Sequence, residues 1–586
     1  MKTTKNIARL AVTAGLTAAL SFGGVIVPVT MAFAEDGSTA PADSITINKA
    51  ADENAANTFK AYQIFKAKVD DVEGKGKVAS DIEWSSTTIG PKVIAAIKGS
   101  AKYKEIVDAD GAAALADSAT APVVAEWLAK NVTGTSASSA TSSEGMRVAP
   151  GDVLYAIAAA ITDETPAGNS FKVDDPWARP DAYGDGYYLF VSDGLTDTTK
   201  PNTGTSPIFA IVGGNPVAVT EKTGIPKVTK KVKDDKPGSN WADKADSQMG
   251  QNVQYQLTGT VADNVATFDT YYYEFRDELS TGLIANLDSV EVKIGDKTLT
   301  KNTVDNATTG YDANIDSTNN ILTVKFTNLK TAAMQAGATL DKDSKVVVTY
   351  TAKLNPDKAT QIVVGGEGNF NSVRLIYSNN PMSDGKGESA PDTVRNYTYA
   401  LKLVKEDSVD ESIKLNGVKF TIQATNPDDN AEGAPSGTKY VQENGTLSEN
   451  KHEFETKNGG VIEVKGLDAG TYTVHEVEGS NPGYNTLDDF AFTISTVKED
   501  GTDSLKQDEG QNELTVSVSK SNIDLVETPS VNNGTITLTV KNKKGSNLPL
   551  TGLNGVTFTW IAGGAMLCIG VAHLIRSRKR DEGSEE

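Results

Sequence analysis

Hydrophobic and polar residues alternate along most of the chain, which is the pattern of half-buried β-strands. Clear examples lie at 253–261, 345–354, 417–424 and 534–540, and turns rich in Gly, Asn and Asp separate such runs. The exception is the segment at about 90–162, where apolar residues recur with helical spacing. The sequence therefore predicts a mainly β protein of tandem Ig-like sandwich domains, with helical insertions in the first domain.

Two proline-bearing junctions, at 223–230 and 389–400, divide the strand-rich region into three parts. We expect an N-terminal domain over 35–222, a middle domain over 223–395 and a C-terminal domain over 396–547. Because the junctions are short, the three domains should follow one another as a rod.

Both ends of the chain carry the features of targeting segments. Basic residues precede an Ala-rich apolar stretch that closes in a small-x-small cleavage pattern, so residues 1–34 are predicted to be a signal peptide. The apolar run at 553–575 is long enough to span a bilayer, and the basic residues of the tail at 576–586 would hold that end in the cytoplasm. The sequence thus predicts an exported protein with a membrane segment near its end.

The composition excludes several classes of function. A formal net charge of −21 speaks against nucleic acid as a partner, because phosphate binding needs basic patches. The only cysteine is Cys568, in the apolar run, so covalent reinforcement of the domains must come from chemistry other than disulfides. The three histidines form no plausible cluster, and no hydrolase or nucleotide motif appears. We therefore expect no metal, no cofactor and no turnover enzyme.

Polar residues extend the apolar faces of several predicted strands, since side chains at i and i+2 point the same way. Each of the two later domains has a lysine, an acid and an asparagine in such positions: Lys405, Glu476 and Asn542 in the C-terminal domain, and Lys230, Asp277 and Asn379 in the middle domain. Lys231 or Asn380 could replace its neighbour in the middle domain. A similar pattern at Lys49 and Asp193 in the first domain is not expected to form a bond.

Burial would shift a lysine and a carboxyl group toward their neutral forms. A neutral amine is a nucleophile, and a protonated carboxyl group can polarise an amide and move protons. Held in contact, the three side chains could form a Lys–Asn isopeptide bond with loss of ammonia. The alternative is that each residue lies at a strand end with its head group in water.

The segment directly before the apolar run reads Leu548, Pro549, Leu550, Thr551 and Gly552. Together with the apolar span and the basic tail, this motif at 548–552 resembles the LPxTG cell-wall sorting signal of Gram-positive surface proteins. The resemblance implies that a sortase cuts between Thr551 and Gly552 and passes the acyl group to an amine.

A second resemblance covers nearly the whole chain. The segment at 470–484 is similar to the E-box of Gram-positive pilins, although its gap before proline is longer by two residues. The strands around it resemble a CnaB-like domain, and the middle domain resembles the isopeptide-forming, CnaA-like domain of the same proteins. The resemblance is to the sortase-assembled shaft (backbone) subunits of fimbriae. It implies bonds joining Lys405 to Asn542 and Lys230 to Asn379, promoted by Glu476 and Asp277.

The resemblance also implies a lysine that receives Thr551 of the preceding subunit. The usual Tyr-Pro-Lys motif is missing; Lys222 occupies its place, and Lys227 is the alternative. The implied partners are a pilin-specific and a housekeeping sortase, identical subunits, minor tip and base pilins, peptidoglycan, and a host matrix protein or glycan. The implied location is the cell wall.

Two other readings of the sequence stay open. One is a wall-anchored adhesin or tip pilin that does not polymerise, with the helical insert at 90–162 binding a host molecule. The other is an enzyme displayed on the wall, which nothing in the sequence marks. An acceptor lysine distinguishes the shaft subunit from the adhesin, since an adhesin can lack one.

Overall fold

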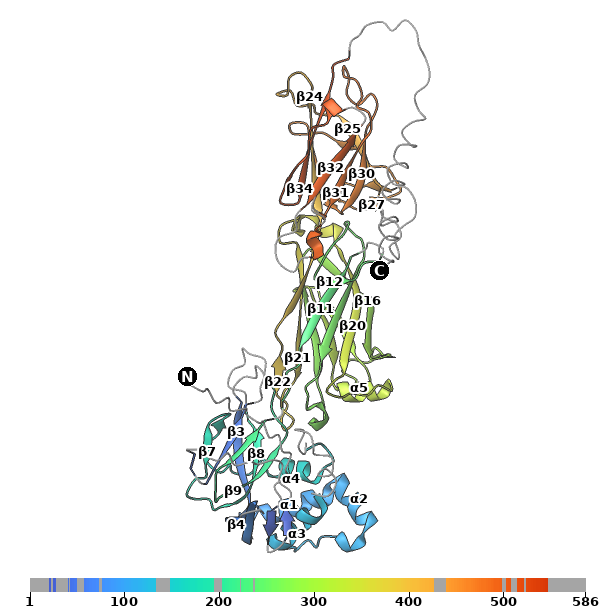
Figure 1. The fold of residues 1–586 in the computed structure, drawn as a ribbon. Coiled ribbons are helices and arrows are strands. Elements are labelled where there is room, and N and C mark those ends of the chain that lie inside the picture. The colour runs from blue at the N-terminus through green and yellow to red at the C-terminus, as the bar shows by residue number, and fades with distance from the viewer. Residues whose placement is uncertain are drawn as a thin grey trace, which may run out of the picture.

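The computed structural model is elongated, with three β-sandwich domains in line (Figure 1). Its described residues are 20–22, 25–27, 40–41, 43–49, 57–72, 76–132, 148–193, 203–221, 223–234, 238–425, 439–497, 502–506, 514–520 and 523–545. Of the predicted signal peptide, they include only two short paired strands, β1 (Leu20–Phe22) and β2 (Val25–Val27), and the predicted span at 553–575 lies outside them. No helix among the described residues is long and apolar enough to cross a membrane.

The N-terminal domain combines two sheets with a layer of helices. One sheet has the order β10 (Val217–Thr220), β3 (Ser44–Asn48), β7 (Pro176–Ala178). The other has the order β5 (Gly76–Trp84), β4 (Thr58–Val72), β8 (Gly186–Ser192), β9 (Ile208–Val212), and β6 (Phe171–Lys172) pairs with β4. The helices are α1 (Ile89–Gly99), α2 (Ala101–Ala109), α3 (Ala121–Val132) and α4 (Val153–Ile161). They confirm the helical insert that apolar spacing predicts.

The middle domain is a sandwich of two large sheets. The first sheet has the order β12 (Trp241–Ala242), β11 (Val228–Lys233), β14 (Val253–Thr260), β20 (Lys345–Leu354), β16 (Leu283–Ile294), β17 (Lys297–Thr298). The second has the order β13 (Lys244–Asp246), β23 (Asp392–Tyr397), β21 (Asn369–Ser378), β15 (Tyr273–Leu279), β19 (Ile321–Phe326), β18 (Asp312–Asp316), and β22 (Lys386–Glu388) pairs with β21. A short helix, α5 (Leu329–Gln335), packs into the same core.

The C-terminal domain is a second two-sheet sandwich. One sheet has the order β29 (Val461–Leu467), β24 (Tyr399–Asp407), β34 (Thr535–Asn542), β33 (Ser530–Asn532). The other has the order β27 (Leu447–Ser448), β26 (Lys439–Val441), β25 (Lys419–Thr425), β30 (Gly470–Glu476), β31 (Phe490–Ser495), β32 (Thr515–Lys520), and β28 (Phe454–Glu455) pairs with β25. The first and last long strands, β24 and β34, are parallel neighbours.

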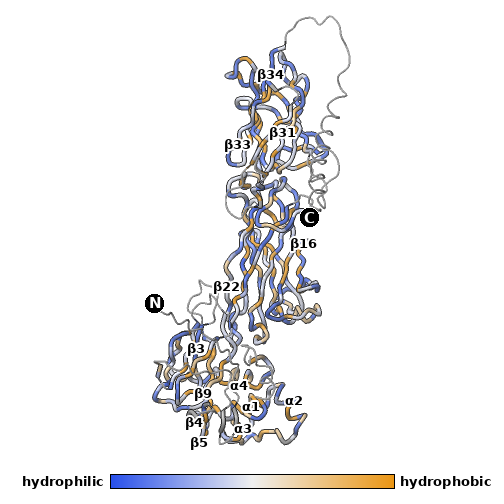
Figure 2. Tube along the Cα trace, in the orientation of Figure 1, coloured by the Kyte–Doolittle hydropathy of each residue, from blue (hydrophilic) through white to orange (hydrophobic). Residues whose placement is uncertain are grey.

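Buried and more exposed residues alternate along the strands, and the buried ones form the cores of both sandwiches, as expected for mainly β domains. Strand β14 alternates buried and more exposed residues throughout, and β34 does the same. The hydropathy colours change repeatedly along the strands of the two sandwiches (Figure 2). Buried apolar side chains of the middle domain form one cluster, and those of the C-terminal domain form another.

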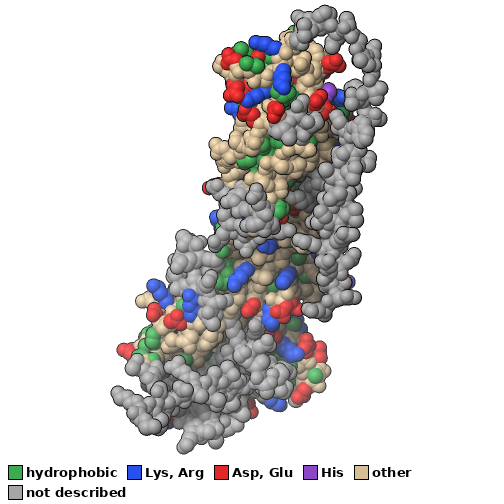
Figure 3. Space-filling view, turned by 45° about the horizontal axis from the view of Figure 1, so that its top comes forward, with side chains coloured by type: hydrophobic (Ala, Val, Ile, Leu, Met, Phe, Trp, Pro, Cys, Tyr) green, Lys and Arg blue, Asp and Glu red, His purple; other side chains and the backbone are tan. Residues whose placement is uncertain are grey.

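Acidic and basic side chains are mixed on the surface, so the negative net charge is partly compensated locally (Figure 3). In the C-terminal domain the carboxylates of Glu406, Glu411 and Glu527 lie within 4.8 Å of one another. The ammonium of Lys541 sits among them, 2.5 Å from Glu411 and 2.6 Å from Glu527. The group is therefore an ion-pair network held by a lysine.

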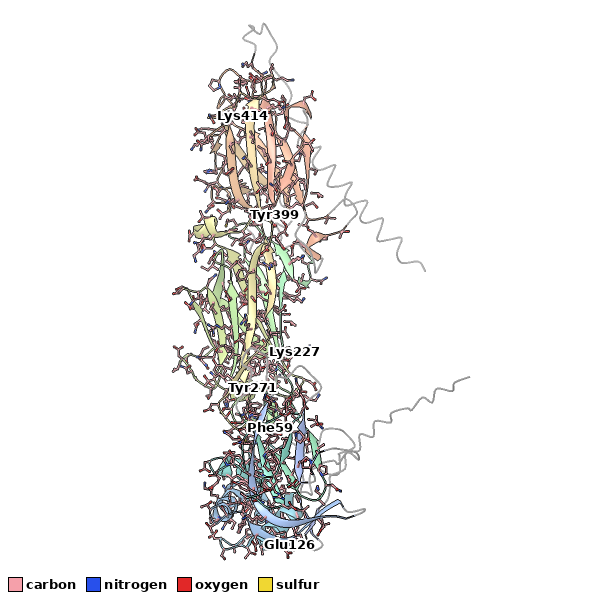
Figure 4. The ribbon with its side chains drawn as sticks, turned by 90° about the vertical axis from the view of Figure 1, so that its left-hand side faces the viewer. Phe59, Glu126, Lys227, Tyr271, Tyr399 and Lys414 are labelled. Carbon is pink, nitrogen blue, oxygen red and sulfur yellow. The ribbon has the colours of Figure 1, made fainter. Side chains whose placement is uncertain are left out.

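A buried polar joint connects the middle and C-terminal domains. Gln248 accepts a hydrogen bond from the hydroxyl of Tyr472 at 3.0 Å and donates one to the carbonyl of Gly445 at 2.6 Å. The hydroxyl of Tyr399 donates to Asp246 at 3.0 Å, and Figure 4 places Tyr399 at this junction. Because these groups are buried, the two domains present complementary donors and acceptors rather than a loose linker.

We predict that Gln248→Ala destabilises the joint, because the partners of Gln248 would stay buried without it. The expected loss in the free energy of unfolding is about 1–3 kcal/mol. Urea unfolding of the two-domain fragment measures it, with the exposed residue Gln254, changed to Ala, as the matched control. Equal stability of the two variants would contradict a polar joint.

Candidate functional sites

The C-terminal site lies where the first and last strands of that domain run side by side. Lys405 pairs with Val540 in the parallel ladder of β24 and β34, and Asn542 follows on the same strand. Glu476 ends β30 in the facing sheet. Because β24 and β34 are parallel, Lys405 and Asn542, which each follow an apolar face, lie at the same end of the sheet. These two residues and Glu476 therefore meet in the core.

The three side chains of this site form a closed hydrogen-bonded triangle. The amine of Lys405 donates to Asn542 Oδ1 and lies 3.2 Å from Glu476 Oε2. Asn542 Nδ2 donates to Glu476 Oε1 at 2.7 Å. All three residues are at most 2% exposed. The carboxylate thus contacts both nitrogens, while the amine contacts the amide oxygen.

Burial makes Lys405 a candidate nucleophile. Loss of water lowers the pKa of Lys405 from 10.5 to about 8, and the nearby charge of Glu476 opposes this shift. The ring of Phe420 lies 5.6 Å from the amine and forms part of its apolar surroundings. A substantial fraction of this lysine is therefore neutral near pH 8, and a neutral amine can attack a carbonyl carbon.

The chain that follows β30 contacts this site and the strands beside it. Beyond Glu476, the chain returns so that the backbone N–H of Leu487 donates to Glu476 Oε2 at 3.3 Å. The hydroxyl of Tyr484 donates to Asp407 at 2.7 Å, and the N–H of Gly545 donates to the carbonyl of Gly483 at 2.9 Å. The Leu487 contact holds the acid, and the other two attach this segment to the end of β24 and to the chain just beyond β34.

The middle-domain site joins the two sheets of its sandwich. Lys230 lies on β11 in one sheet and Asp277 lies on β15 in the other, and their side chains meet at 2.5 Å. Tyr350 of β20 donates to Asp277 Oδ2 at 2.5 Å and accepts from Lys230 at 3.2 Å. Lys230 and Asp277 are both fully buried, as their predicted roles require.

The asparagine predicted for the middle domain is wrong in position. Asp277 pairs with Val373, and Asn379 lies six residues further along, about 20 Å away at the spacing of a strand. Its place is taken by Asn371, which is fully buried and donates from Nδ2 to the hydroxyl of Tyr350 at 2.6 Å. Strands β15 and β21 are antiparallel, so the end of one lies beside the start of the other.

Lys231 and Asn380, the alternatives predicted for the middle domain, both have partners outside the site of Lys230 and Asp277. Lys231 is partly exposed and pairs with Asp243 at 2.5 Å. Asn380 donates to the carbonyl of Ser192 at 2.9 Å and so helps join the N-terminal and middle domains. Asn371 and Tyr350 were not identified from the sequence. The signal for Asn371 was present, because it starts the apolar face that continues through Val373.

Burial shifts both charged groups of the middle site toward neutrality. It lowers the pKa of Lys230 from 10.5 to about 8, and it raises the pKa of Asp277 above its usual value. Each partner's charge opposes the shift of the other. Transfer of a proton from the amine to the carboxylate is thereby made less costly than in water.

In the first domain Lys49 and Asp193 have separate partners. Asp193 pairs with Lys60 at 2.9 Å and accepts from Ser170 at 2.9 Å. Lys49 uses its backbone N–H to bind Asp174 at 2.7 Å.

The residues predicted for polymerisation lie mostly outside the described part of the chain. This is true of Lys222 and of the motif at 548–552. The preceding residue, Glu221, is buried and accepts from Asn57 at 2.8 Å. The alternative acceptor, Lys227, is exposed near the N-terminal end of the middle domain (Figure 4).

The fold and the two sites define a class of protein: tandem β-sandwich domains, two of which hold a buried lysine, acid and asparagine in one hydrogen-bonded network. Residues 400–511 match the family model of the SpaA prealbumin-like fold domain. This match coincides with most of the C-terminal sandwich and includes Lys405 and Glu476. No match is found among curated protein sequences.

Several solved structures are similar to the chain at low sequence identity. One is a backbone pilin of Streptococcus pyogenes, with 16% identity, a TM-score of 0.44, and coverage of 87% of this chain and 100% of that one. Another is the major pilin SpaD from Corynebacterium diphtheriae, with 16% identity, a TM-score of 0.44, and coverage of 87% and 99%. A third is the major pilin RrgB from Streptococcus pneumoniae, with 14% identity, a TM-score of 0.36, and coverage of 66% and 89%.

We predict that bond formation in the C-terminal site accelerates as pH rises and levels off above about 8, the pKa of Lys405. The sign follows from the amine, which is protonated and unreactive below its pKa and neutral above it. The measurement is peptide mapping of the Lys405–Asn542 link at timed intervals after the unfolded chain is refolded at each pH. A rate that does not change with pH would contradict the role of the amine.

Proposed function

We propose that this chain is a structural shaft subunit of a covalently polymerised surface fimbria, sealed internally by two Lys–Asn isopeptide bonds. One joins Lys405 to Asn542 and the other joins Lys230 to Asn371. The observation that carries the proposal is the buried triangle of Lys405, Glu476 and Asn542. It lies between the first and last strands of a domain that ends just before a sorting motif. The match of residues 400–511 to the SpaA prealbumin-like domain supports it.

The chemistry of the C-terminal bond follows from the contacts of Glu476. Lys405 gives a proton to the carboxylate and attacks the amide carbon of Asn542, whose oxygen it already contacts. The bond from this carbon to Nδ2 breaks, and a proton passes by way of Glu476, which lies 2.7 Å from Nδ2, to the leaving nitrogen. The products are an amide and ammonia, and the reaction occurs once in each molecule.

The placement of this bond suits a protein that carries tension. It ties β24 to β34, which are the first and last long strands of the domain. Force that enters at one strand can leave through the other without separating the sheet. The bond encloses 137 residues of sequence separation, and by analogy with disulfides this restriction of the unfolded chain contributes about 4–5 kcal/mol.

Polymerisation would use the two ends of the chain. A pilin-specific sortase would cut after Thr551 and join it to Lys222 of the next subunit, and a housekeeping sortase would join the finished polymer to peptidoglycan. Minor pilins would occupy the tip and base, and the shaft would support adhesion to a host matrix protein or glycan. The protein itself turns over no substrate, since its isopeptide chemistry is a single event.

We predict that the folded region at 35–547 has a mass about 34 Da below that of its sequence, because each bond releases one ammonia of about 17 Da. Asn542→Ala should restore about 17 Da and lower the melting temperature, as should Glu476→Ala. Intact mass spectrometry and calorimetry measure both effects. Asn532→Ala, at an exposed position in the same sheet, is the matched control. A full sequence mass for the unaltered protein would end the proposal of internal bonds.

We predict that a strain with Lys222→Ala loses the ladder of high-mass polymers on denaturing gels of cell-wall extracts. The reason is that the acyl group of Thr551 would have no acceptor amine. A strain with Lys227→Ala is the control and should keep its ladder. Loss of the ladder only with Lys227→Ala would move the acceptor to that residue, and single, unlinked subunits in the unaltered strain would favour an adhesin.

A further inference from the structure

The two buried sites differ in the side chain that contacts both the lysine amine and the asparagine amide nitrogen. In the C-terminal domain, Glu476 lies 3.2 Å from the amine and 2.7 Å from the amide nitrogen, so one carboxylate contacts both. In the middle domain, which the structure describes throughout this core, Asp277 contacts the amine of Lys230 but makes no hydrogen bond to Asn371. Aspartate is one methylene shorter than glutamate, so its carboxylate contacts the amine of Lys230 but does not bond the amide nitrogen of Asn371.

The hydroxyl of Tyr350 fills the gap that the shorter acid leaves. It lies 3.2 Å from the amine of Lys230 and 2.6 Å from Nδ2 of Asn371, and it donates to Asp277 at 2.5 Å. Tyr350 is 2% exposed, and its ring stacks on Tyr255 with centroids 5.4 Å apart. The hydroxyl is therefore held in place against both nitrogens that the reaction uses.

We propose that Tyr350 is the proton shuttle of the middle-domain bond, passing a proton from the attacking nitrogen of Lys230 to the leaving nitrogen of Asn371. The proposal rests on the proposed bond between these two residues. Amide exchange needs such a transfer, because the attacking nitrogen must lose a proton and the leaving nitrogen must gain one. A hydroxyl can do both at once, since it accepts with its oxygen and donates its own hydrogen.

The steps balance without any further reactant. Lys230 first gives one proton to Asp277, and its neutral nitrogen then attacks the amide carbon of Asn371. Tyr350 takes a proton from the attached nitrogen and gives its own to Nδ2, and the bond from carbon to Nδ2 breaks. Ammonia leaves, an amide remains, and the proton held by Asp277 passes to the departing ammonia.

The test compares Tyr350→Phe with Tyr255→Phe. Both changes remove one buried hydroxyl and keep the stacked rings, but only the first hydroxyl contacts the reacting nitrogens. The unfolded chain is refolded, and the bond between Lys230 and Asn371 is followed by peptide mapping. A positioned proton donor contributes about a hundredfold to a rate, so Tyr350→Phe should slow this bond by about that factor and Tyr255→Phe should not. The C-terminal bond in the same molecules should form at its usual rate.

A second variant separates proton transfer from packing. Changing Asp277→Glu in the Tyr350→Phe background supplies a longer acid that can reach both nitrogens, as Glu476 does. This double variant should form the bond faster than Tyr350→Phe alone. Fluorotyrosine in place of Tyr350 keeps the ring and both contacts but makes the hydroxyl more acidic, so the rate should change.

The outcomes distinguish the shuttle from the proposed function. If the unaltered protein lacks the Lys230–Asn371 bond, the proposed function fails for this domain. If the bond is present and Tyr350→Phe forms it at the usual rate, only the shuttle is overturned. An unchanged rate with fluorotyrosine, or a double variant no faster than the single one, would also overturn it.

Discussion

An amine held out of water is the constraint on which both sandwich cores depend. Lys405 and Lys230 have no exposed side-chain surface, and each would be costly to bury alone. Each core supplies a carboxyl group within hydrogen-bond reach of the amine. The amide of Asn542 contacts Lys405 directly, and Asn371 is linked to Lys230 through the hydroxyl of Tyr350. The same burial that makes the charge costly also makes the amine a nucleophile, so destabilisation and reactivity have one cause.

The two domains meet this constraint at different places in the sandwich. In the C-terminal domain the amine and amide lie on neighbouring parallel strands of one sheet, with the acid on the facing sheet. In the middle domain Lys230 belongs to one sheet, and Asp277 and Asn371 belong to the other. A bond in the first case would tie two neighbouring central strands of one sheet, and a bond in the second would hold the two sheets together. The buried joint around Gln248 lies between the two domains and couples them.

The rule that alternate residues of a strand share a face identified Lys405 and Asn542, which lie together because the first and last strands of that domain are parallel. In parallel strands, polar residues that follow an apolar face lie at the same end of the sheet. The same rule selected Asn379 in the middle domain, where β15 and β21 are antiparallel. There the start of β21, at Asn371, lies beside the end of β15. Asn371 therefore precedes the apolar face of its strand instead of following it. Tyr350 had no sequence signal, because a tyrosine within an apolar face is ordinary core packing.

The sequence by itself determined the mainly β class, the helical insert of the first domain, the acids of both cores and the lysine of the C-terminal core. Periodicity carries that information, because each side chain's face follows from its position along its own strand. Only the tertiary structure decided between Lys230 and Lys231, and which asparagine shares the hydroxyl of Tyr350 with that lysine. Strand direction and pairing depend on contacts between residues far apart in the chain, and the period of a single strand does not contain them.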